Sequence, residues 1–590
     1  MNDPVRIASK AIDIHGNEAE NLLAVLRHIQ KSCHYIPGEA VQMVARKFSL
    51  PPARIQSVVE FYSFLHTRPR GEYDIYFSDC IIDLFGGVES LVDRLCKRLG
   101  TAPGKVRADG RVSIDTTACT GLCDQGPALL VNGLAIGGLT PQRIDEIAER
   151  IQQGVPLEGW PSEWFQIKDS FRRTDLLLNT QWRSGDALKR ALRYGPDHVL
   201  AELSESGLRG RGGAGFPTAL KWKYCREAPG DHYVVCNADE GEPGTFKDRE
   251  ILKHRADQVY EGMTLAAWVT GAKRGFLYLR AEYECLVGAL EVALLQRRRR
   301  GLLGRNICGL MDFHFDIQIM LGAGAYICGE ESALINSIEG LRGTPRNRPP
   351  YPVTSGLWGQ PTVVNNVESF AAASLILMHD GAWFSKVGTY KSKGTKLLSV
   401  SGDCERPGIY EVPFGIKVEE VLDLCGVGET LGVQVGGPSG TFVTPEEYDR
   451  RIAYEDLGTG GSFMVFDAER DLLDIVHNFT RFFAHESCGF CTPCRVGTSL
   501  QLKLVEKLKM GWGTAGDIQE LERLAQLLNA SHCGLGHTAA NPVQTTLARR
   551  AELYQARLND IDFSPGFDLD GELETARQLT GRFGDHLSQE

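Results

Sequence analysis

Four cysteines near the C-terminal end are spaced so that their thiolates could share one inorganic centre. Cys488, Cys491 and Cys494 form a Cys-x2-Cys-x2-Cys run, and Cys533 follows within Ser-His-Cys-Gly-Leu-Gly. Three thiolates on one tight loop, with a fourth from elsewhere, are a common ligand set for a [4Fe–4S] cluster. A structural zinc more often takes two separated Cys-x2-Cys pairs or closes with histidine, and His532 would be a fifth candidate beside Cys533, not a replacement. The spacing therefore predicts a [4Fe–4S] cluster.

A glycine-rich loop in the middle of the chain could bring backbone close to a phosphate. Residues 207–216 read Gly-Leu-Arg-Gly-Arg-Gly-Gly-Ala-Gly-Phe, in which Gly210, Gly212 and Gly215 satisfy Gly-x-Gly-x-x-Gly. A dinucleotide fingerprint should follow a strand, whereas residues 198–206 look helical, so the ordinary Rossmann order is not expected. Dense glycine nevertheless suits close approach to a ligand. Positive charge is supplied by Arg209, Arg211 and Lys221. The alternative is a mobile surface loop.

Polar residues follow the next expected strand. Residues 233–236 read as a strand that ends in Asn237-Ala-Asp239-Glu240-Gly-Glu242. Parallel α/β sheets bind ligands beyond the carboxyl ends of their strands, so we expect these side chains at a binding site. Similar residues recur further along the chain, at Tyr326, Gly329, Glu330, Glu331, Asn365 and Asn366. Asparagine can donate to and accept from a flavin ring edge, although a turn or helix cap is the alternative for each.

Hydrophobic periodicity divides the 590 residues into several domains, as their number leads one to expect. The pattern is helical first, then mixed, then β-rich, and helical again near the end. The expected divisions are a helical segment at 1–70, a small α/β domain at 71–153, a linker at 154–184, a larger α/β domain at 185–392, a β-rich domain at 393–467, a helical bundle at 468–560 and an extended tail at 561–590.

The composition excludes several classes of partner. A net charge of −11 argues against nucleic acid, because phosphate binding needs clustered Lys and Arg. The sequence contains no run of 18 apolar residues, so we expect no helix that spans a membrane. It also shows no apolar signal segment, and we therefore expect a cytoplasmic protein. In such a compartment, sixteen cysteines indicate metal ligation or simple burial more than disulfides.

Together these motifs resemble the flavin-binding subunits of respiratory NADH dehydrogenases, a family that includes the diaphorase subunits of NAD-linked hydrogenases and formate dehydrogenases. The resemblance covers about residues 180–560, and residues 20–150 separately resemble the thioredoxin-like [2Fe–2S] subunit of the same enzymes. The presence of both regions on one polypeptide most resembles the large diaphorase subunits of soluble NAD-reducing nickel–iron hydrogenases. The stretches that carry the resemblance are 209–222, 237–249, 326–331, 343–352, Asn365-Asn366 and the four C-terminal cysteines.

The resemblance implies a multidomain α/β fold: N-terminal helices, a thioredoxin-like domain, a Rossmann-like FMN and NAD domain, a β-grasp (ubiquitin-like) insert and a C-terminal four-helix bundle with the iron–sulfur cluster. It implies that FMN is bound by Gly210, Arg211, Gly212, Gly213, Gly215, Lys221, Asn237, Asp239, Glu240, Tyr326, Gly329, Glu330, Asn365 and Asn366. It implies that NAD(H) lies against Phe216, Glu242, Glu331, Arg348 and Tyr351, the last two replacing a Lys and a Phe that relatives often have.

The chemistry that the resemblance implies belongs to the cofactors. NADH gives flavin a hydride, iron–sulfur clusters take single electrons, and the flavin converts between the two modes. We therefore expect no catalytic side chain. The implied partners are a small iron–sulfur diaphorase subunit and nickel–iron hydrogenase subunits. The alternatives are the NADH-dehydrogenase module of an NAD-dependent formate dehydrogenase or respiratory-type complex, and a flavin-free, zinc-stabilised assembly scaffold.

The N-terminal cysteines depart from the family pattern. Cys119 and Cys123 resemble the second ligand pair of the [2Fe–2S] domain. Where relatives have Cys-x4-Cys as the first pair, this chain has Ser78 and Asp83, with Cys80 between them. Three thiolates with an oxygen from Asp83 or Ser78 could hold a [2Fe–2S] cluster, since such sites are known with ligands other than Cys. The alternative is a degenerate domain kept for packing and docking.

Overall fold

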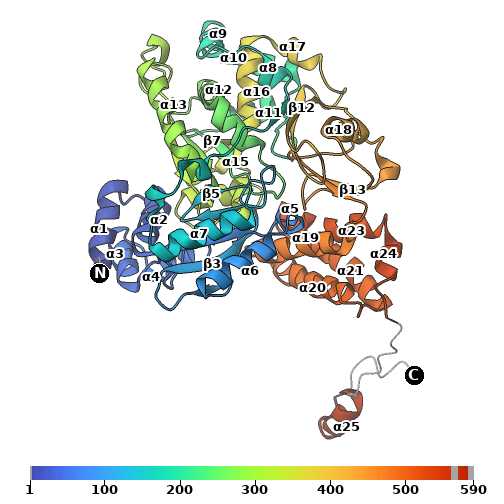
Figure 1. Cartoon of the computed structure of the whole chain (residues 1–590). Coiled ribbons are helices and arrows are strands. Elements are labelled where there is room, and N and C mark those ends of the chain that lie inside the picture. The colour runs from blue at the N-terminus through green and yellow to red at the C-terminus, as the bar shows by residue number, and fades with distance from the viewer. Residues whose placement is uncertain (1–2, 560–568, 583–590) are drawn as a thin grey trace.

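Three sheets, each with its own helices, form the framework that positions the cysteines and the glycine-rich loop (Figure 1). The computed structural model describes residues 3–559 and 569–582 of the chain. This architecture confirms the multidomain α/β fold expected from the sequence. Within the described ranges, no helix has the length and apolar character needed to cross a membrane.

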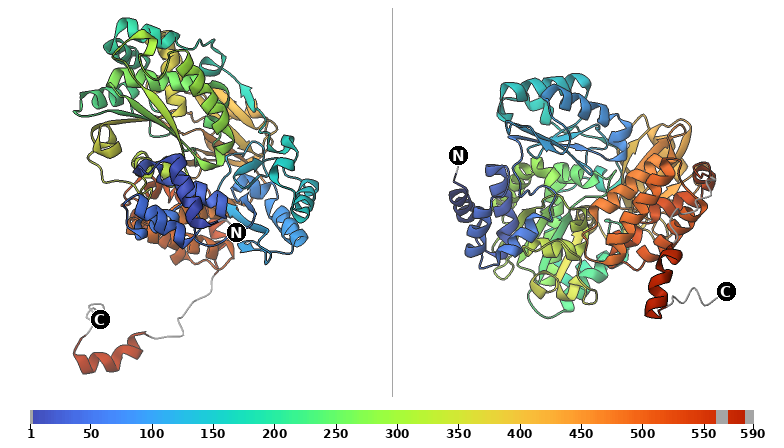
Figure 2. Two further views of the ribbon diagram at one scale, coloured as in Figure 1. Left: turned by 90° about the vertical axis from the view of Figure 1, so that its left-hand side faces the viewer. Right: turned by 90° about the horizontal axis from the view of Figure 1, so that it is seen from below.

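The N-terminal helices cover one face of the central sheet (Figure 2). They are α1 (Pro4–His15), α2 (Leu22–Cys33), α3 (Gly38–Lys47) and α4 (Pro52–Val59). Leu22, Val25, Leu26 and Ile29 form the apolar stripe of α2, and all four are fully buried. Their core is continuous with side chains of the central sheet, so these helices do not form an independent domain.

The first sheet belongs to the thioredoxin-like domain and has the strand order β2-β3-β1-β4-β5. β1 pairs with β3 in parallel and with β4 antiparallel, and α6 packs beside α7. The bounds are β1 (Tyr73–Ser78), α5 (Ile81–Phe85), α6 (Val88–Leu99), β2 (Lys105–Val106), β3 (Val112–Thr117), β4 (Leu129–Val131), β5 (Leu134–Ile136) and α7 (Pro141–Gln153).

The expected linker at 154–184 is part of two neighbouring domains. Trp160 and Trp164 are buried in the core of the thioredoxin-like domain. Further along, β6 (Phe171–Arg173) pairs in parallel with β12 (Gly408–Pro413) as an edge strand of another sheet. The segment rich in tryptophan and proline, which the sequence suggests is a linker, is therefore packed against both domains.

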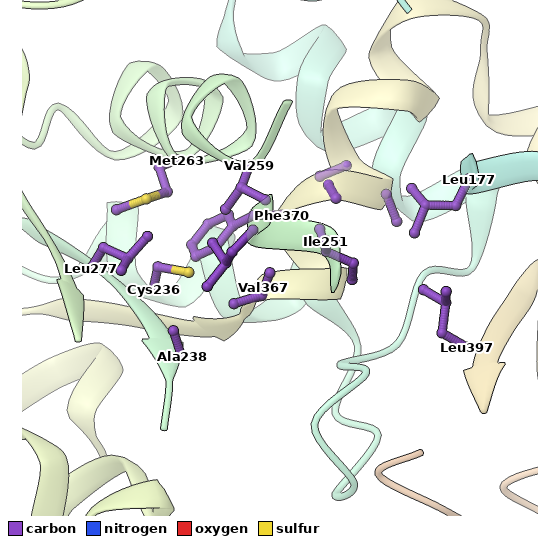
Figure 3. Packing of buried hydrophobic residues seen from close by; sticks show 14 of the residues in the cluster. Leu177, Cys236, Ala238, Ile251, Val259, Met263, Leu277, Val367, Phe370 and Leu397 are labelled. Atoms are coloured by element: carbon purple, nitrogen blue, oxygen red, sulfur yellow. The ribbon is translucent and has the colours of Figure 1, made fainter. Parts of the chain in front are cut away.

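The central sheet is parallel throughout, with the order β10-β7-β8-β9. Its strands are β7 (Tyr233–Ala238), β8 (Arg274–Leu279), β9 (Asp316–Leu321) and β10 (Thr362–Asn366). Both faces are buried, as parallel sheets require. Cys236 and Leu277 pack against α12 (Lys247–Thr270) and α16 (Val367–Met378), as Figure 3 shows, whereas Val235 and Phe276 face the N-terminal helices.

The third sheet is mixed, with the order β14-β13-β15-β11-β12-β6, and α18 (Val418–Cys425) packs on it. One helix against a small mixed sheet is the arrangement expected of the β-grasp insert. The remaining strands are β11 (Thr395–Gly402), β13 (Thr430–Val435), β14 (Thr441–Val443) and β15 (Ser462–Asp467).

The C-terminal helices hold the second cysteine group. They are α19 (Leu472–Glu486), α20 (Thr492–Lys509), α21 (Ala515–Leu528), α22 (Gly534–Thr538), α23 (Asn541–Leu547) and α24 (Ala551–Gln555). The expected tail at 561–590 lies partly outside the described residues. Its described part contains a helix, α25 (Leu569–Thr580), where we expected an extended chain, and α25 lies apart from the rest in Figure 1.

The contact between α12 and α16 can be tested at Gly262. A Cβ at this position would lie 2.0 Å from the Phe370 carbonyl oxygen of α16, so neither backbone could stay in place. We expect Gly262→Ala to cost about 3 kcal/mol, which thermal unfolding should show as a clearly lower Tm. Gly288→Ala is the control, because nothing lies within 4 Å of its Cβ position in α13 (Val287–Arg299). An unchanged Tm for Gly262→Ala would contradict this packing.

Candidate functional site

Two neighbouring parallel strands end in asparagines at the same level of the central sheet. In the register of β7 with β10, Asn366 stands opposite Asn237 and Asn365 opposite Cys236. Asn237 donates from Nδ2 to the Gly329 carbonyl at 2.8 Å, and Asn365 Oδ1 accepts from Trp222 Nε1 at 2.9 Å. The sheet thus brings together asparagines that lie far apart in the sequence, at the edge where parallel sheets bind ligands.

The glycine-rich loop closes over this edge. It connects α10 (Pro196–Ser206) to α11 (Thr218–Glu227), so a helix precedes it, as expected, and not a strand. The Gly210 amide donates to the Phe216 carbonyl at 2.9 Å, which fixes the base of the loop. Gly212 packs on Asn366, since an added Cβ would lie 3.3 Å from the Asn366 Cβ. Gly215 has φ +65°, and its added Cβ would meet the Tyr454 ring at 2.6 Å, so this position requires glycine.

Three buried oxygen atoms beside the loop and the strand ends have no hydrogen-bond partner among the described residues. They are Asp239 Oδ2, Thr218 Oγ1 and Glu330 Oε1, the last of which lies 3.4 Å from the Arg348 guanidinium as an ion pair. Buried polar groups are nearly always hydrogen-bonded, so these atoms fit a ligand that carries N–H and hydroxyl groups. Burial raises the pKa of Asp239 well above its usual range, and a protonated carboxyl group can also donate. Sequence reasoning did not identify Thr218, although it begins the helix that follows the loop.

Four charged residues of the predicted set form a group of ion pairs. Lys221 Nζ is 3.1 Å from Glu331 Oε2, and Arg348 lies 3.4 Å from Glu330 and 3.6 Å from Glu331. All four come from the sequence-predicted set, and the structure places them together. The predicted aromatic residues are open to solvent, with exposed fractions of 45% for Phe216 and 55% for Tyr351.

Glu242 is held apart from those ion pairs. One carboxylate oxygen accepts from the Ser439 amide at 2.9 Å and from the Ser439 hydroxyl at 2.6 Å. The other accepts from the Tyr326 hydroxyl. Burial raises the pKa of Glu242 despite these bonds. Tyr326 in turn packs edge-to-face on Phe482 of α19, with ring centroids 4.9 Å apart, so this part of the site adjoins the C-terminal helices.

A buried charge network supports Asn366, and sequence reasoning missed it. Asn366 Nδ2 donates to Asp248 at 2.6 Å, and Lys247 donates to Asn366 Oδ1 at 3.2 Å. Glu368, at the start of α16, lies 3.3 Å from Lys247 and also accepts from Lys396 of β11. Residues 247–250 read Lys-Asp-Arg-Glu, and all four are buried.

The four C-terminal thiols line one small cavity. Cys488, Cys491, Cys494 and Cys533 lie around it with Ile327 of the central domain. A single zinc bound at about 2.3 Å needs its sulfurs roughly 4 Å apart, whereas a cubane binds each thiolate to a different iron. Among the described residues, no three of these thiols lie within 4.8 Å of one another.

Burial raises the pKa of two thiols of this cavity, Cys494 and Cys533, to about 11, so metal binding at these two positions must release protons. Cys491 and Cys533 are the N-cap residues of α20 and α22.

The N-terminal thiols gather more tightly. Cys80, Cys119 and Cys123 are buried and lie within 4.8 Å of one another, and the last two sulfurs are 3.4 Å apart. The structure does not place Asp83 with them. Its carboxylate accepts from the Ser78 hydroxyl at 2.6 Å and from the Ala128 amide at 3.0 Å. Three of the four expected metal ligands, the thiols of Cys80, Cys119 and Cys123, thus lie together. The expected oxygen ligand, Asp83, is hydrogen-bonded to protein groups instead.

Three family models match the chain. Residues 203–374 match the Nuo51 FMN-binding domain, residues 8–152 the thioredoxin-like [2Fe–2S] ferredoxin, and residues 474–557 the iron–sulfur binding region of NADH-ubiquinone oxidoreductase-F. These domains bind the cofactors expected from the sequence: FMN, a [2Fe–2S] cluster and a [4Fe–4S] cluster.

Known proteins match over nearly the whole length. The alpha subunit of the NAD-reducing hydrogenase HoxS of Cupriavidus necator is 40% identical, over 95% of this chain and 96% of its own. The F subunit of the NADH-quinone oxidoreductase of Mycobacterium tuberculosis is 39% identical over 69% of this chain and 95% of its own. A crystal structure of NAD+-reducing [NiFe]-hydrogenase in the H2-reduced state aligns with a TM-score of 0.89 and 44% identity, over 97% of this chain and 98% of that chain. The chain therefore belongs to the family of NAD-dependent flavin and iron–sulfur oxidoreductase subunits that includes the alpha subunits of NAD-reducing hydrogenases.

Proposed function

We propose that this chain exchanges a hydride between NAD(H) and bound FMN, and passes single electrons through its clusters to or from partner subunits. The observation that carries the proposal is the packing of the glycine-rich loop on Asn366, which stands opposite Asn237 at the carboxyl edge of a parallel sheet. When bound, FMN supplies the conversion between two-electron hydride transfer and one-electron transfer. The residues of the chain bind FMN and NAD(H), orient them and shield them from water, and none of these residues needs to act as a nucleophile.

For FMN, the loop and the start of α11 offer backbone amides to the phosphate, with Arg211 and Lys221 as nearby cations. The unpartnered oxygens of Asp239 and Thr218 offer hydrogen bonds to the ring and ribityl chain. The space beside Gly213 is open, because no atom lies within 4 Å of the position that an added Cβ would take. The sequence-predicted FMN residues therefore remain our proposed ligand set, with Thr218 added.

For NAD(H), the proposed surface is formed by the exposed faces of Phe216 and Tyr351 beside Glu331. Aromatic faces can stack on nicotinamide or adenine, which gives orientation at little entropic cost. Carboxylates repel the 2′-phosphate of NADP, so Glu330 and Glu331 favour NAD. Arg348 could oppose this preference, but both carboxylates already pair with it.

For partners, we propose a small iron–sulfur diaphorase subunit and nickel–iron hydrogenase subunits. Known relatives are subunits of multi-subunit enzymes, among them the NAD-reducing hydrogenase. Apolar side chains are exposed beside the [4Fe–4S] cysteines, and Phe490, between Cys488 and Cys491, is 54% exposed. Such a patch suits a protein interface at which electrons leave or enter. Cytoplasmic location is consistent with the chain's sixteen free thiols.

The proposed function predicts strong selectivity for NADH over NADPH. Protein reconstituted with FMN under anaerobic conditions should reduce an artificial dye with NADH, and kcat/KM for NADPH should be at least tenfold lower.

Glu331→Gln should raise KM for NADH roughly tenfold, about 1.4 kcal/mol, while FMN stays bound. Glu405→Gln, which breaks an exposed ion pair with Arg406, is the control. Absence of flavin, or equal kcat/KM for the two nucleotides, would refute the proposal.

The C-terminal cysteines should bind iron and not zinc. Cys494→Ser should remove about four irons per chain together with one set of EPR signals, because a buried hydroxyl is a poor substitute for thiolate. Cys96→Ser, in α6 and outside the two cysteine groups, should change neither. Stoichiometric zinc in wild-type protein purified without added metal would contradict the assignment.

The structure changes what we expect of Asp83. Both carboxylate oxygens already accept protein hydrogen bonds, so we propose that Asp83 positions the loop and that Cys80, Cys119 and Cys123 supply three of the four terminal ligands of the N-terminal cluster. Asp83→Asn should then keep the cluster and its EPR signal, whereas Asp83→Ala should lose it. If Asp83→Asn alone removes about two irons per chain, Asp83 is a ligand as the sequence suggested.

A further inference from the structure

Arg280 connects the N-terminal cysteine loop to the strand ends of the central sheet. It follows β8 directly and is only 4% exposed. One guanidinium nitrogen, Nη2, donates to the Cys119 carbonyl at 2.6 Å, and Nη1 donates to the Glu240 carbonyl. Glu282 pairs with the same guanidinium at 2.7 Å. A single planar cation thus spans the two sites.

Other buried groups close the same junction. Arg249 donates to the Gly121 carbonyl at 2.6 Å and pairs with Asp124 at 2.8 Å. Tyr283 donates to Glu240 at 3.0 Å, and Gly121 packs on the Tyr283 ring so closely that an added Cβ would lie 2.5 Å from its hydroxyl oxygen. These contacts join the cysteine loop to the central domain.

A small cavity separates the two sites, and Arg280 forms part of its wall. The thiol loop contributes Cys119, and the strand ends contribute Asp239. Asp239 carries one of the unpartnered buried oxygens that we assign to the flavin site. Arg280 thus both donates to the cysteine loop and borders the proposed flavin site.

We infer that Arg280 is a positioning residue shared by both redox sites, and that its buried positive charge favours the reduced state of the N-terminal cluster. The inference rests on the proposed function, which assigns a cluster to Cys80, Cys119 and Cys123. Reduction adds one negative charge to that cluster, and a cation held beside its loop in a low-dielectric region lowers the energy of that state. The planar guanidinium also bridges two carbonyls and a carboxylate at once, which a lysine ammonium cannot reproduce.

The inference predicts how the reduction potential responds to substitution. In anaerobic full-length protein with both clusters, Arg280→Gln should lower the midpoint of the N-terminal cluster in an EPR-monitored redox titration. We expect at least a tenfold smaller reduced-to-oxidised ratio at a fixed potential, which is about 59 mV for a one-electron couple. The [4Fe–4S] midpoint should not move. Arg280→Lys keeps the charge but not the bridge, so its midpoint should lie in between, with altered g values.

Arg297→Gln is the matched control. Arg297 is also buried and paired, with Asp257 and Glu261, but it lies on α13 away from both cysteine groups, so neither midpoint should change. An Arg280→Gln protein that keeps the cluster at the wild-type midpoint would overturn the inference. If that variant loses the cluster, Arg280→Lys decides, and a wild-type spectrum and midpoint there overturn the inference too. Wild-type protein with only about four irons per chain would overturn both this inference and the proposed N-terminal cluster.

Discussion

The proposed flavin site depends on the parallel pairing of β7 with β10. Because the two strands are in register, Asn237 and Asn366 reach the edge of the sheet side by side, although more than a hundred residues separate them in the sequence. The glycine-rich loop can then pack directly on Asn366 through Gly212, where any larger residue would be crowded. A shift of one residue in this register would turn the asparagines to the opposite faces and separate the loop from its support.

Buried ion pairs and hydrogen bonds connect this part of the central domain to the neighbouring domains. Lys396 reaches from β11 of the β-grasp insert to Glu368 and donates to the Arg211 carbonyl at 3.3 Å, so one domain holds the loop of another. Burial lowers the pKa of Lys396 to about 7, even with Glu368 beside it. Removing one partner would leave an uncompensated buried charge, which is far more costly than losing a surface ion pair. On the other side, Arg249 and Arg280 hold the N-terminal cysteine loop in the same way.

Much of this arrangement could be predicted from local sequence. The cysteine spacing, the helix before the glycine-rich loop and the buried stripe of α2 all follow from patterns of a few residues. The burial of the charged run at 247–250 could not be predicted from the sequence, because its partners come from distant segments such as β10, α16 and the cysteine loop. The same limit explains Asp83, whose partners Ser78 and Ala128 are set by the folded loop, and the pairing of β6 with β12 across more than two hundred residues.

The central claim is that one polypeptide holds a flavin between two iron–sulfur clusters in a fixed arrangement. The most direct test is to measure FMN, iron and acid-labile sulfide in one anaerobic wild-type preparation, and to record EPR spectra before and after NADH. The account predicts one FMN and about six irons per chain, with two distinct cluster signals once reducing equivalents are supplied. No flavin, or about four irons with a single signal, would contradict it.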